Sequence, residues 1–212
     1  MQELFAAGTE STSATVEWTI VELIKNNEAA HGLRDELAEV IKGDMVRESD
    51  LSSLPYLEAC IKETLRLHPP GPVLIPHRAV QTCKVMGYTI PKDSEVMVNF
   101  WAIARDPAVW DDPLSYKPER FLASGLDYTG QKFEYIPFGS GRKICAGQPL
   151  ASRSIPLIVA TLVHTFDWFL PSNMELAHID MKDNYDLTMR KEESLSVILK
   201  LRKTVTAAAT VV

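Results

Sequence analysis

The segment FGSGRKICAG, residues 138–147, constrains the fold of this 212-residue chain more than any other feature of its sequence. It begins with Phe138 and holds three glycines around one cysteine, Cys145. Glycine lets a backbone adopt unusual dihedral angles and approach a flat object closely. An apolar stretch follows, so we expect a helix that begins near Cys145 and runs to about Thr165. The segment therefore predicts a tight backbone turn immediately before a helix.

The chemistry of Cys145 follows from its expected place at the start of that helix. A helix N-terminus presents free N–H groups and the positive end of the helix dipole, and both stabilise a thiolate. Arg142 and Lys143 add positive charge beside it. A stabilised thiolate in a tight backbone cradle, next to an aromatic side chain, is what a haem iron ligand requires. The alternative is a buried, inert cysteine beside a glycine-rich turn, which is the usual state of a free cysteine.

Composition argues against several other classes of protein. Apolar residues make up 46% of the chain, which excludes a disordered or collagen-like protein. A formal charge of −6 argues against a nucleic-acid partner. The three distant cysteines form no CxxC motif, which argues against a disulfide framework and a structural zinc site. We expect no membrane anchor in this chain, because its longest apolar stretch, residues 155–163, is much shorter than the roughly 20 residues that a bilayer requires.

The periodicity of apolar residues predicts a mainly α-helical chain with small β-sheets, of the α+β class. Besides the helix after Cys145, the expected helices cover residues 3–25, 28–42 and 56–67. Short strands are expected at 73–78, 83–86, 88–90 and 95–100, and a terminal hairpin at 185–190 and 195–201. Residues 101–147 form a long irregular stretch, and such stretches tend to be functional. No linker divides the chain, so we expect one unit over 1–203 and a frayed tail at 204–212.

The cysteine segment resembles the haem-binding signature of the cytochrome P-450 monooxygenases, F-x-x-G-x-R-x-C-x-G. The residues that match it are Phe138, Gly141, Arg142, Cys145 and Gly147. The resemblance implies that Cys145 is the axial ligand to the iron of haem b, and that the other four residues and Gly139 bind the haem. It also implies that the chain is the C-terminal half of the cytochrome P-450 fold, from the central helix to the terminal hairpin.

Two further segments, KETLR and PERF, match motifs of the same family. Glu63 and Arg66 are three residues apart on the third expected helix, and an exposed pair at this spacing contributes only about 0.2–0.5 kcal/mol. In the family this E-x-x-R pair lies on a buried helix and is joined by the arginine of the P-E-R-F box, which is Arg120 here. A buried charged trio is costly unless it is fully hydrogen-bonded. The resemblance therefore implies a structural, positioning role for these three residues.

The segment AGTEST, residues 7–12, resembles the oxygen-activation stretch of the family's long central helix. By this resemblance Gly8 opens space over the iron for dioxygen, and Glu10 supplies an acid. Ser11 stands where the family usually has threonine; its hydroxyl still donates a hydrogen bond but lacks the methyl group that fixes the rotamer. Thr12 lies beside it and can share the role. The alternative is that these hydroxyls bond back to helix carbonyls, as such residues commonly do.

Two residues outside these motifs bear on haem retention. Arg78 follows the third helix on an expected strand, where the family places a cation for a haem propionate; Arg142 is the second candidate, and the alternative for Arg78 is a plain surface residue. Pro156 falls inside the helix after Cys145. There it removes a backbone hydrogen bond and is expected to kink the helix, at a cost of about 3 kcal/mol. The kink would weaken haem retention.

The motifs together imply a haem-thiolate monooxygenase that inserts one oxygen atom from O2 into a small hydrophobic substrate. The wording KETLRLHPPGP, WAIARDP and PFGSGRKICAG resembles the plant microsomal branch of the family. The implied substrate is a plant terpenoid or alkaloid, and the implied partner is an NADPH-dependent cytochrome P-450 reductase. The implied location of a full-length parent is the cytosolic face of the endoplasmic reticulum membrane.

Two alternatives remain open. Members of the family are considerably longer than this chain, so it is expected to lack the membrane anchor and most substrate-recognition loops. It is then a truncated fragment without catalytic activity. The second alternative, an α+β domain of unrelated function, must treat the ordered motifs as coincidence.

Overall fold

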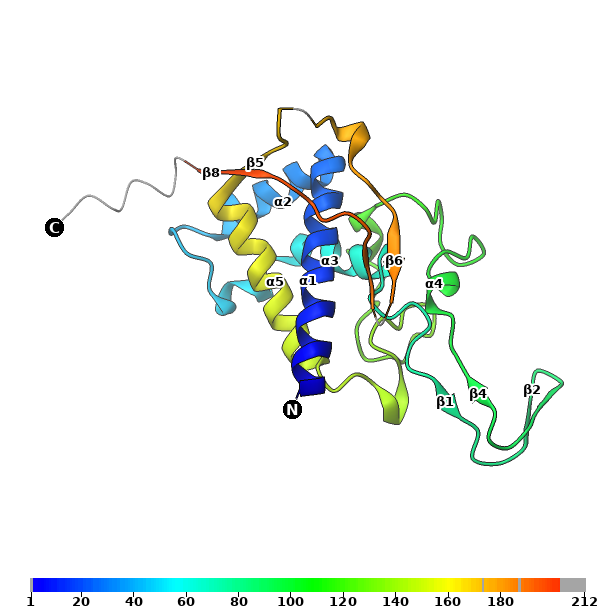
Figure 1. Cartoon of the computed structure of the whole chain (residues 1–212). Helices are drawn as coiled ribbons and strands as arrows, with labels where there is room; N and C mark the ends of the chain where they lie inside the picture. The colour runs from blue at the N-terminus through cyan, green and yellow to red at the C-terminus, as the bar shows by residue number, and fades with distance from the viewer. Residues whose placement is uncertain (1, 173, 187, 203–212) are drawn as a thin grey trace.

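Helices form the body of the molecule, and short strands lie around it (Figure 1). The structure, a computed structural model, describes residues 2–172, 174–186 and 188–202, with the side chains of residues 2–4 and 6 left out. The helices are α1 (Gln2–Lys25), α2 (Asn27–Val40), α3 (Pro55–Leu67), the short α4 (Phe100–Ile103) and α5 (Gln148–Thr165). Turns of 3₁₀ helix lie at Glu48–Ser53, Pro118–Phe121, Gly141–Lys143 and Leu176–His178. The expected mainly α fold with small sheets is confirmed.

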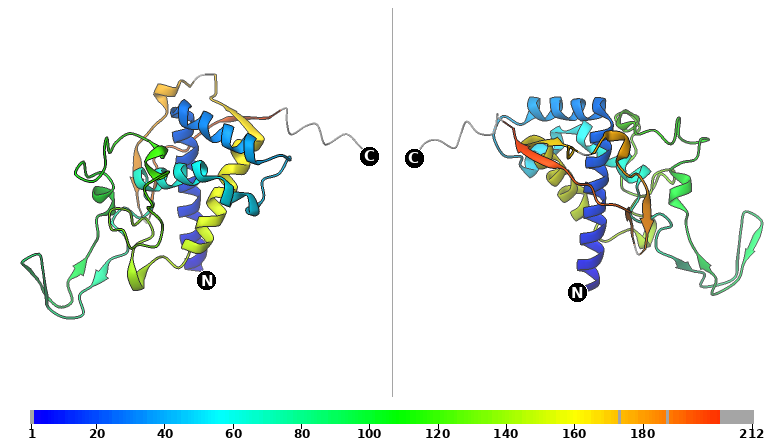
Figure 2. Two further views of the ribbon diagram at one scale, coloured as in Figure 1. Left: turned by 180° about the vertical axis from the view of Figure 1, so that it is seen from behind. Right: turned by 45° about the horizontal axis from the view of Figure 1, so that its top comes forward.

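The two longest helices, α1 and α5, pack against each other and organise the main core (Figures 1 and 2). On α5 the apolar residues Ile155, Val159 and Val163 recur every four positions, so they share one face, and all three are buried. Helices α2 and α3 close the same core. Their buried side chains in this core include Leu33, Leu37, Leu57, Ile61 and Leu65.

A second, aromatic core holds the long irregular stretch in place. Trp110, Phe121 and Tyr135 are buried together, and the Phe121 and Tyr135 rings have centroids 4.9 Å apart. The Tyr135 hydroxyl donates a hydrogen bond of 3.0 Å to the carbonyl of Lys62 on α3. Aromatic pairs of this kind contribute beyond the area that they bury. Residues 101–147 are therefore a packed layer against α3, although they contain little regular secondary structure.

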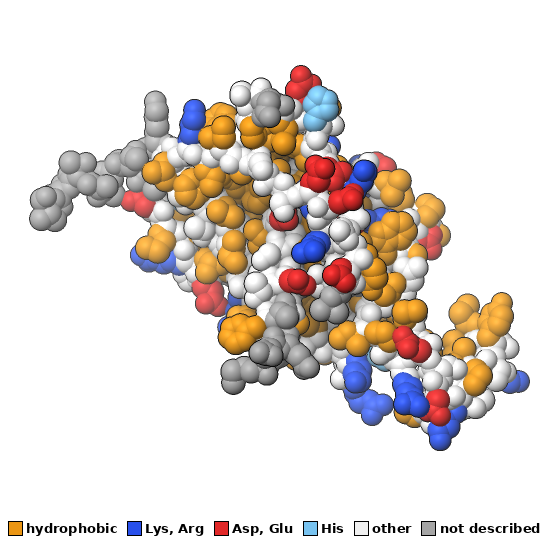
Figure 3. All heavy atoms as spheres, viewed as in Figure 1, with side chains coloured by type: hydrophobic (Ala, Val, Ile, Leu, Met, Phe, Trp, Pro, Cys, Tyr) orange, Lys and Arg blue, Asp and Glu red, His pale blue; other side chains and the backbone are white. Residues whose placement is uncertain are grey.

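The strands form four separate two-stranded antiparallel sheets among the described residues. Strands β1 (His77–Arg78) and β4 (Glu95–Val96) lead into the hairpin of β2 (Cys83–Val85) and β3 (Tyr88–Ile90), which projects from the body of the molecule (Figure 1). Its apolar side chains Val85, Met86 and Tyr88 are exposed, and hydrophobic atoms gather at its tip in Figure 3. No helix among the described residues is long and apolar enough to cross a membrane.

The predicted terminal hairpin is wrong. Strand β6 (Asp183–Tyr185) pairs with β7 (Met189–Lys191), and β8 (Ile198–Leu201) pairs instead with β5 (Phe166–Phe169). The alternating pattern of β8 fits any antiparallel partner, and the pattern does not say which strand that partner is. Strand β5 follows α5 directly in the chain, and the packing of α5 places β5 beside β8. The predicted frayed tail at 204–212 lies outside the described residues.

The predicted start of the last helix needs a correction too. Helix α5 begins at Gln148, so Cys145 precedes it and does not open it. Pro149 occupies the first turn, where a missing N–H costs nothing because that group has no partner within the helix. Helix α5 continues through Pro156 to Thr165. Its buried face against the main core offsets the lost hydrogen bond, so the proline does not end the helix.

Candidate functional site

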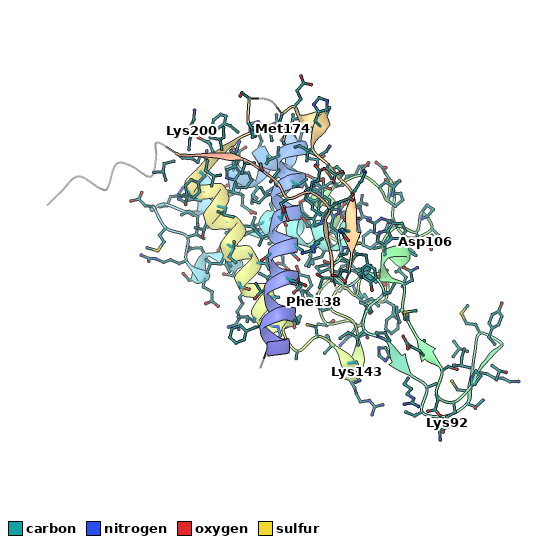
Figure 4. The ribbon with its side chains drawn as sticks, in the orientation of Figure 1. Lys92, Asp106, Phe138, Lys143, Met174 and Lys200 are labelled. Atoms are coloured by element: carbon teal, nitrogen blue, oxygen red, sulfur yellow. The ribbon has the colours of Figure 1, made fainter. Side chains whose placement is uncertain are left out.

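The cysteine loop, residues 138–147, lies at the end of the molecule where α1 and α5 begin (Figures 1 and 4). Phe138 packs against the main core, whereas Lys143 projects from the loop toward solvent in Figure 4. The ring of Phe138 meets the ring of Tyr128 edge to face, with centroids 5.3 Å apart. The aromatic start of the loop is therefore fixed by packing, whereas Arg142, Lys143 and Cys145 are exposed.

Backbone geometry shapes this loop around Cys145. The Cys145 N–H donates to the carbonyl of Phe138 at 2.8 Å, which closes the loop. Gly139 and Gly141 have φ angles of 76° and 65°, a region that strains other residues. The thiol of Cys145 is exposed and free. The loop thus presents one thiol to solvent from a closed backbone turn, and the sequence-based alternative of a buried cysteine does not describe it.

Gly130, a glycine that sequence reasoning missed, lies in close contact with the backbone of the cysteine loop. Gly130 has a φ of 71°, and a Cβ there would lie 2.5 Å from the carbonyl oxygen of Gly139. The hydroxyl of Ser140 donates to the carbonyl of Gly130 at 2.5 Å. Such close approach of two backbone segments requires glycine. Gly130 stands in an ordinary TGQ stretch, so its sequence context carries no signal for this contact.

The predicted trio of Glu63, Arg66 and Arg120 comes together in the structure. Nε and Nη2 of Arg66 donate to the two carboxylate oxygens of Glu63 at 2.7 and 2.8 Å. Nε of Arg120 donates to Oε1 of Glu63 at 2.9 Å, and the backbone N–H of Lys117 donates to the same oxygen at 2.8 Å. Glu63 and Arg66 are fully buried. We call these three residues the Glu63 cluster.

The remaining donors of the Glu63 cluster reach backbone carbonyls of the irregular stretch. Nη1 of Arg66 donates to the carbonyls of Ala104 and Pro113 at 2.6 and 2.7 Å. The ring of Trp110, a tryptophan expected to anchor the core or a loop, lies 5.1 Å from the Arg66 guanidinium carbon. A buried charge is tolerated only when its hydrogen-bonding groups are satisfied. The cluster therefore ties α3 to residues 104–120.

The segment 7–12 on the first turns of α1 is open on one side. Apart from the backbone of its own helix, no atom of the described residues lies within 4 Å of the position that a Cβ of Gly8 would occupy. Glu10 is exposed and accepts a hydrogen bond of 3.2 Å from the hydroxyl of Thr188. The Ser11 hydroxyl donates to the carbonyl of Ala7 at 2.6 Å, which is the back-bonding alternative, and Thr12 is half-buried.

The two candidate propionate cations differ in their surroundings. Arg78 is 74% exposed and pairs with Asp93 at 3.0 Å within its own hairpin region, as a surface arginine does. Arg142 is exposed in the 3₁₀ turn Gly141–Lys143 of the cysteine loop. Arg142 thus lies in the same loop as Cys145, close to it in the sequence. Arg78, in contrast, is paired with the carboxylate of Asp93.

Comparison with known proteins gives the class to which this fold and this loop belong. The family model of the cytochrome P-450 family matches residues 1–198. This chain belongs to the cytochrome P-450 family. The match covers residues 7–12, the Glu63 cluster and the cysteine loop in one run.

Plant proteins are similar to the chain over nearly its whole length. A probable (S)-N-methylcoclaurine 3'-hydroxylase isozyme of Coptis japonica is 54% identical over 95% of this chain, which covers 41% of that protein. A geraniol 8-hydroxylase of Swertia mussotii is 51% identical over 92% of this chain and 40% of that protein. The chain spans about two fifths of the length of these curated relatives.

Solved structures show the same fold. A zebrafish cytochrome P-450 with abiraterone matches with a TM-score of 0.85 and 34% sequence identity. The match covers 95% of this chain and 46% of the zebrafish chain. The prediction that this chain has the fold of the C-terminal portion of a cytochrome P-450 is confirmed.

Proposed function

We propose that this chain is the haem-binding part of a haem-thiolate monooxygenase, with Cys145 as the axial ligand to the iron of haem b. One observation carries the proposal: a free, exposed thiol stands in a closed turn whose positive φ angles fall on glycines. The remaining haem-binding residues in the proposal are Phe138, Gly139, Gly141, Arg142, Gly147 and Arg78.

The residues present fit such a group. A thiolate sulfur is a soft ligand of the kind that haem iron accepts. Among the described residues, no side-chain atom lies within 4 Å of the position that a Cβ would occupy at Gly8 or at Gly141, so a flat macrocycle meets none of these side chains there. Arg142 and Arg78 are exposed cations of the charge that carboxylate propionates attract. In this proposal, residues 1–203 together form the C-terminal part of one cytochrome P-450 domain.

When bound, the haem activates dioxygen, from which one oxygen atom enters the substrate. The chain's own residues have three tasks in this proposal. Cys145 donates electron density through its sulfur. Glu10 holds a proton at its carboxylate, and Ser11 and Thr12 pass protons through their hydroxyls, for which the Ser11 hydroxyl must turn away from the Ala7 carbonyl. The Glu63 cluster positions α3 against the layer that leads into the cysteine loop.

The proposed substrate is a small hydrophobic plant metabolite of the terpenoid or alkaloid class. The support is that relatives at 50–54% identity are named for hydroxylation of an alkaloid and of the terpenoid geraniol. The proposed electron donor is an NADPH-dependent cytochrome P-450 reductase, and the proposed location of the whole protein is the cytosolic face of the endoplasmic reticulum membrane.

The ligand assignment is tested by the carbon-monoxide difference spectrum of the reduced chain with added haem. We expect a strongly red-shifted Soret band that is lost in Cys145→Ala. The matched control is Cys83→Ala, because Cys83 is also an exposed free cysteine but lies on strand β2. A band that persists in Cys145→Ala, or that disappears in Cys83→Ala, contradicts the assignment.

A second candidate is a chain that keeps the fold without performing the chemistry. Pro156 favours it, because a proline inside α5 removes a backbone hydrogen bond from the helix that follows Cys145. Absence of any thiolate-type band from the wild-type chain supports this candidate. If the band forms, titration with geraniol and with (S)-N-methylcoclaurine tests the substrate class: a saturable spectral shift supports it.

A further inference from the structure

A buried histidine, His68, joins three elements of the fold. His68 follows α3 and stacks on Trp18 of α1, with ring centroids 3.7 Å apart and planes inclined by 4°. Its Nε2 lies 2.7 Å from Oε1 of Glu22, also on α1. Its Nδ1 lies 3.7 Å from Oδ1 of Asp183 on β6. His68 and Glu22 have side chains that are only 8% and 7% exposed.

The two ring nitrogens of His68 are unequally satisfied. Nε2 has a carboxylate partner, whereas Nδ1 is buried and has no hydrogen-bond partner among the described residues. A neutral imidazole has one N–H and a protonated imidazole has two. Protonation therefore gives Nδ1 a proton that faces the carboxylate of Asp183. A short approach of β6 then closes a second charge-assisted hydrogen bond.

Other charged groups surround this cluster. Lys191 of β7 lies 4.8 Å from the ring centroid of Trp18 and donates to the carbonyl of Asp180. Arg105 donates to the backbone at the end of α3; burial lowers its pKa to about 10, and the charge of Asp183 opposes that shift. Both cations oppose a positive His68. The carboxylates of Glu22 and Asp183, in contrast, face the two ring nitrogens directly, at 2.7 and 3.7 Å.

The hairpin of β6 and β7 also reaches the candidate oxygen-activation segment. Thr188, next to β7, donates its hydroxyl to Glu10, and the Met189 N–H donates to the carbonyl of Pro70 at 2.9 Å. Asp183 stands at the other end of the same hairpin. A movement of β6 relative to His68 therefore also moves Thr188, the hydrogen-bond partner of Glu10, because both belong to the same hairpin.

We propose that His68 is a pH-sensitive latch that positions the β6–β7 hairpin against α1. Doubly protonated His68 bridges Glu22 and Asp183 and holds the hairpin; neutral His68 keeps only Glu22 and releases Asp183. Because the latched state binds the extra proton, latching is strongest at low pH and is lost as the pH rises. His68 is a positioning residue, and the latch does not depend on bound haem.

Amide hydrogen exchange of the chain, corrected for the intrinsic exchange rate, tests the latch at about pH 5.5 and about pH 8, which bracket histidine titration. We expect several-fold greater protection of the β6–β7 hairpin at the lower pH, with α5 peptides as the internal reference. Asp183→Asn and His68→Gln lose most of this difference. The matched control His178→Gln keeps it, because His178 is an exposed histidine. A difference that persists in Asp183→Asn overturns the latch.

A second measurement needs no variant of the buried cluster. Nitrogen-15 NMR of the histidine rings reports whether one or both ring nitrogens of His68 carry a proton. We expect the doubly protonated ring at low pH and a singly protonated ring, with its proton on Nε2, at high pH. A ring that stays singly protonated across the range overturns the latch, whatever the haem spectra show.

Discussion

The Glu63 cluster and the cysteine loop hold their polar groups in opposite ways. Glu63 and Arg66 are shielded from solvent, and their positions depend on hydrogen bonds to segments far away in the sequence. Cys145 is exposed, and its position depends on the backbone of its own loop. A buried charge must be satisfied within the fold, whereas an exposed thiol is left available to a ligand. In the proposed function, the first region positions elements of the fold and the second binds the haem.

Removal of the central acid is the most severe test of this comparison. Glu63→Gln leaves two arginines facing each other without a carboxylate, so we expect a loss of about 3–5 kcal/mol in the free energy of unfolding. Denaturant titration measures it. The control is Glu58→Gln on the same helix, whose carboxylate is 54% exposed and pairs with Lys62. The control is expected to cost at most about 1 kcal/mol; equal losses in both variants contradict the positioning role.

Alkylation of the free cysteines separates a buried thiol from an exposed one. Burial of Cys60 on α3 raises the pKa of its thiol well above its ordinary range, which keeps it in the unreactive thiol form at neutral pH. In a Cys83→Ala background we expect Cys60 to react at least about a hundredfold more slowly than Cys145, since each pKa unit removes about tenfold of the thiolate. Iodoacetamide kinetics followed by mass spectrometry measure both rates. Similar rates would show that the contrast in burial is wrong.

A glycine series distinguishes backbone clash from backbone dihedral strain in the cysteine loop. Gly130→Ala meets both, because its Cβ would overlap the Gly139 carbonyl, and we expect a loss of about 2–3 kcal/mol. At Gly141 the φ angle is positive but the space for a Cβ is open, so we expect Gly141→Ala to lower the free energy of unfolding by about 1–2 kcal/mol. The control is Gly43→Ala, where there is neither a clash nor a positive φ angle. We expect its free energy of unfolding to change by at most about 0.5 kcal/mol. Thermal unfolding gives this ranking, and a reversed order of the first two refutes the contact between the two loops.

The smallest effect is expected at Ser11. Its exposed hydroxyl only bonds back to the helix, so Ser11→Ala changes the free energy of unfolding by less than about 0.5 kcal/mol, with a gain in helix propensity. Thr19→Ala is the comparison on the same helix: its hydroxyl makes the same type of bond but is buried, and its loss costs about 1 kcal/mol. A large loss in Ser11→Ala would indicate a structural role for that hydroxyl.

Several features of the fold were predictable because they are local. The spacing of apolar residues in α3 and α5 is set within a few turns, and both helices lie close to the expected ranges. The glycines at 139 and 141 do adopt the unusual dihedral angles that their residue type permits. The close contacts within the Glu63 cluster, in contrast, were expected only because the motifs resemble a family.

Features that depend on distant partners were not determined by the sequence pattern. The alternation in residues 195–201 predicted a strand, but only tertiary packing decided that β5 and not residues 185–190 is its partner. The same holds for Gly130, whose contact with the cysteine loop has no sequence signal, and for His68, whose carboxylates come from α1 and β6. Periodicity and residue type report on neighbours along the chain. Which segments meet is decided by the way the whole core closes, because burial and hydrogen bonding are satisfied for all segments at once.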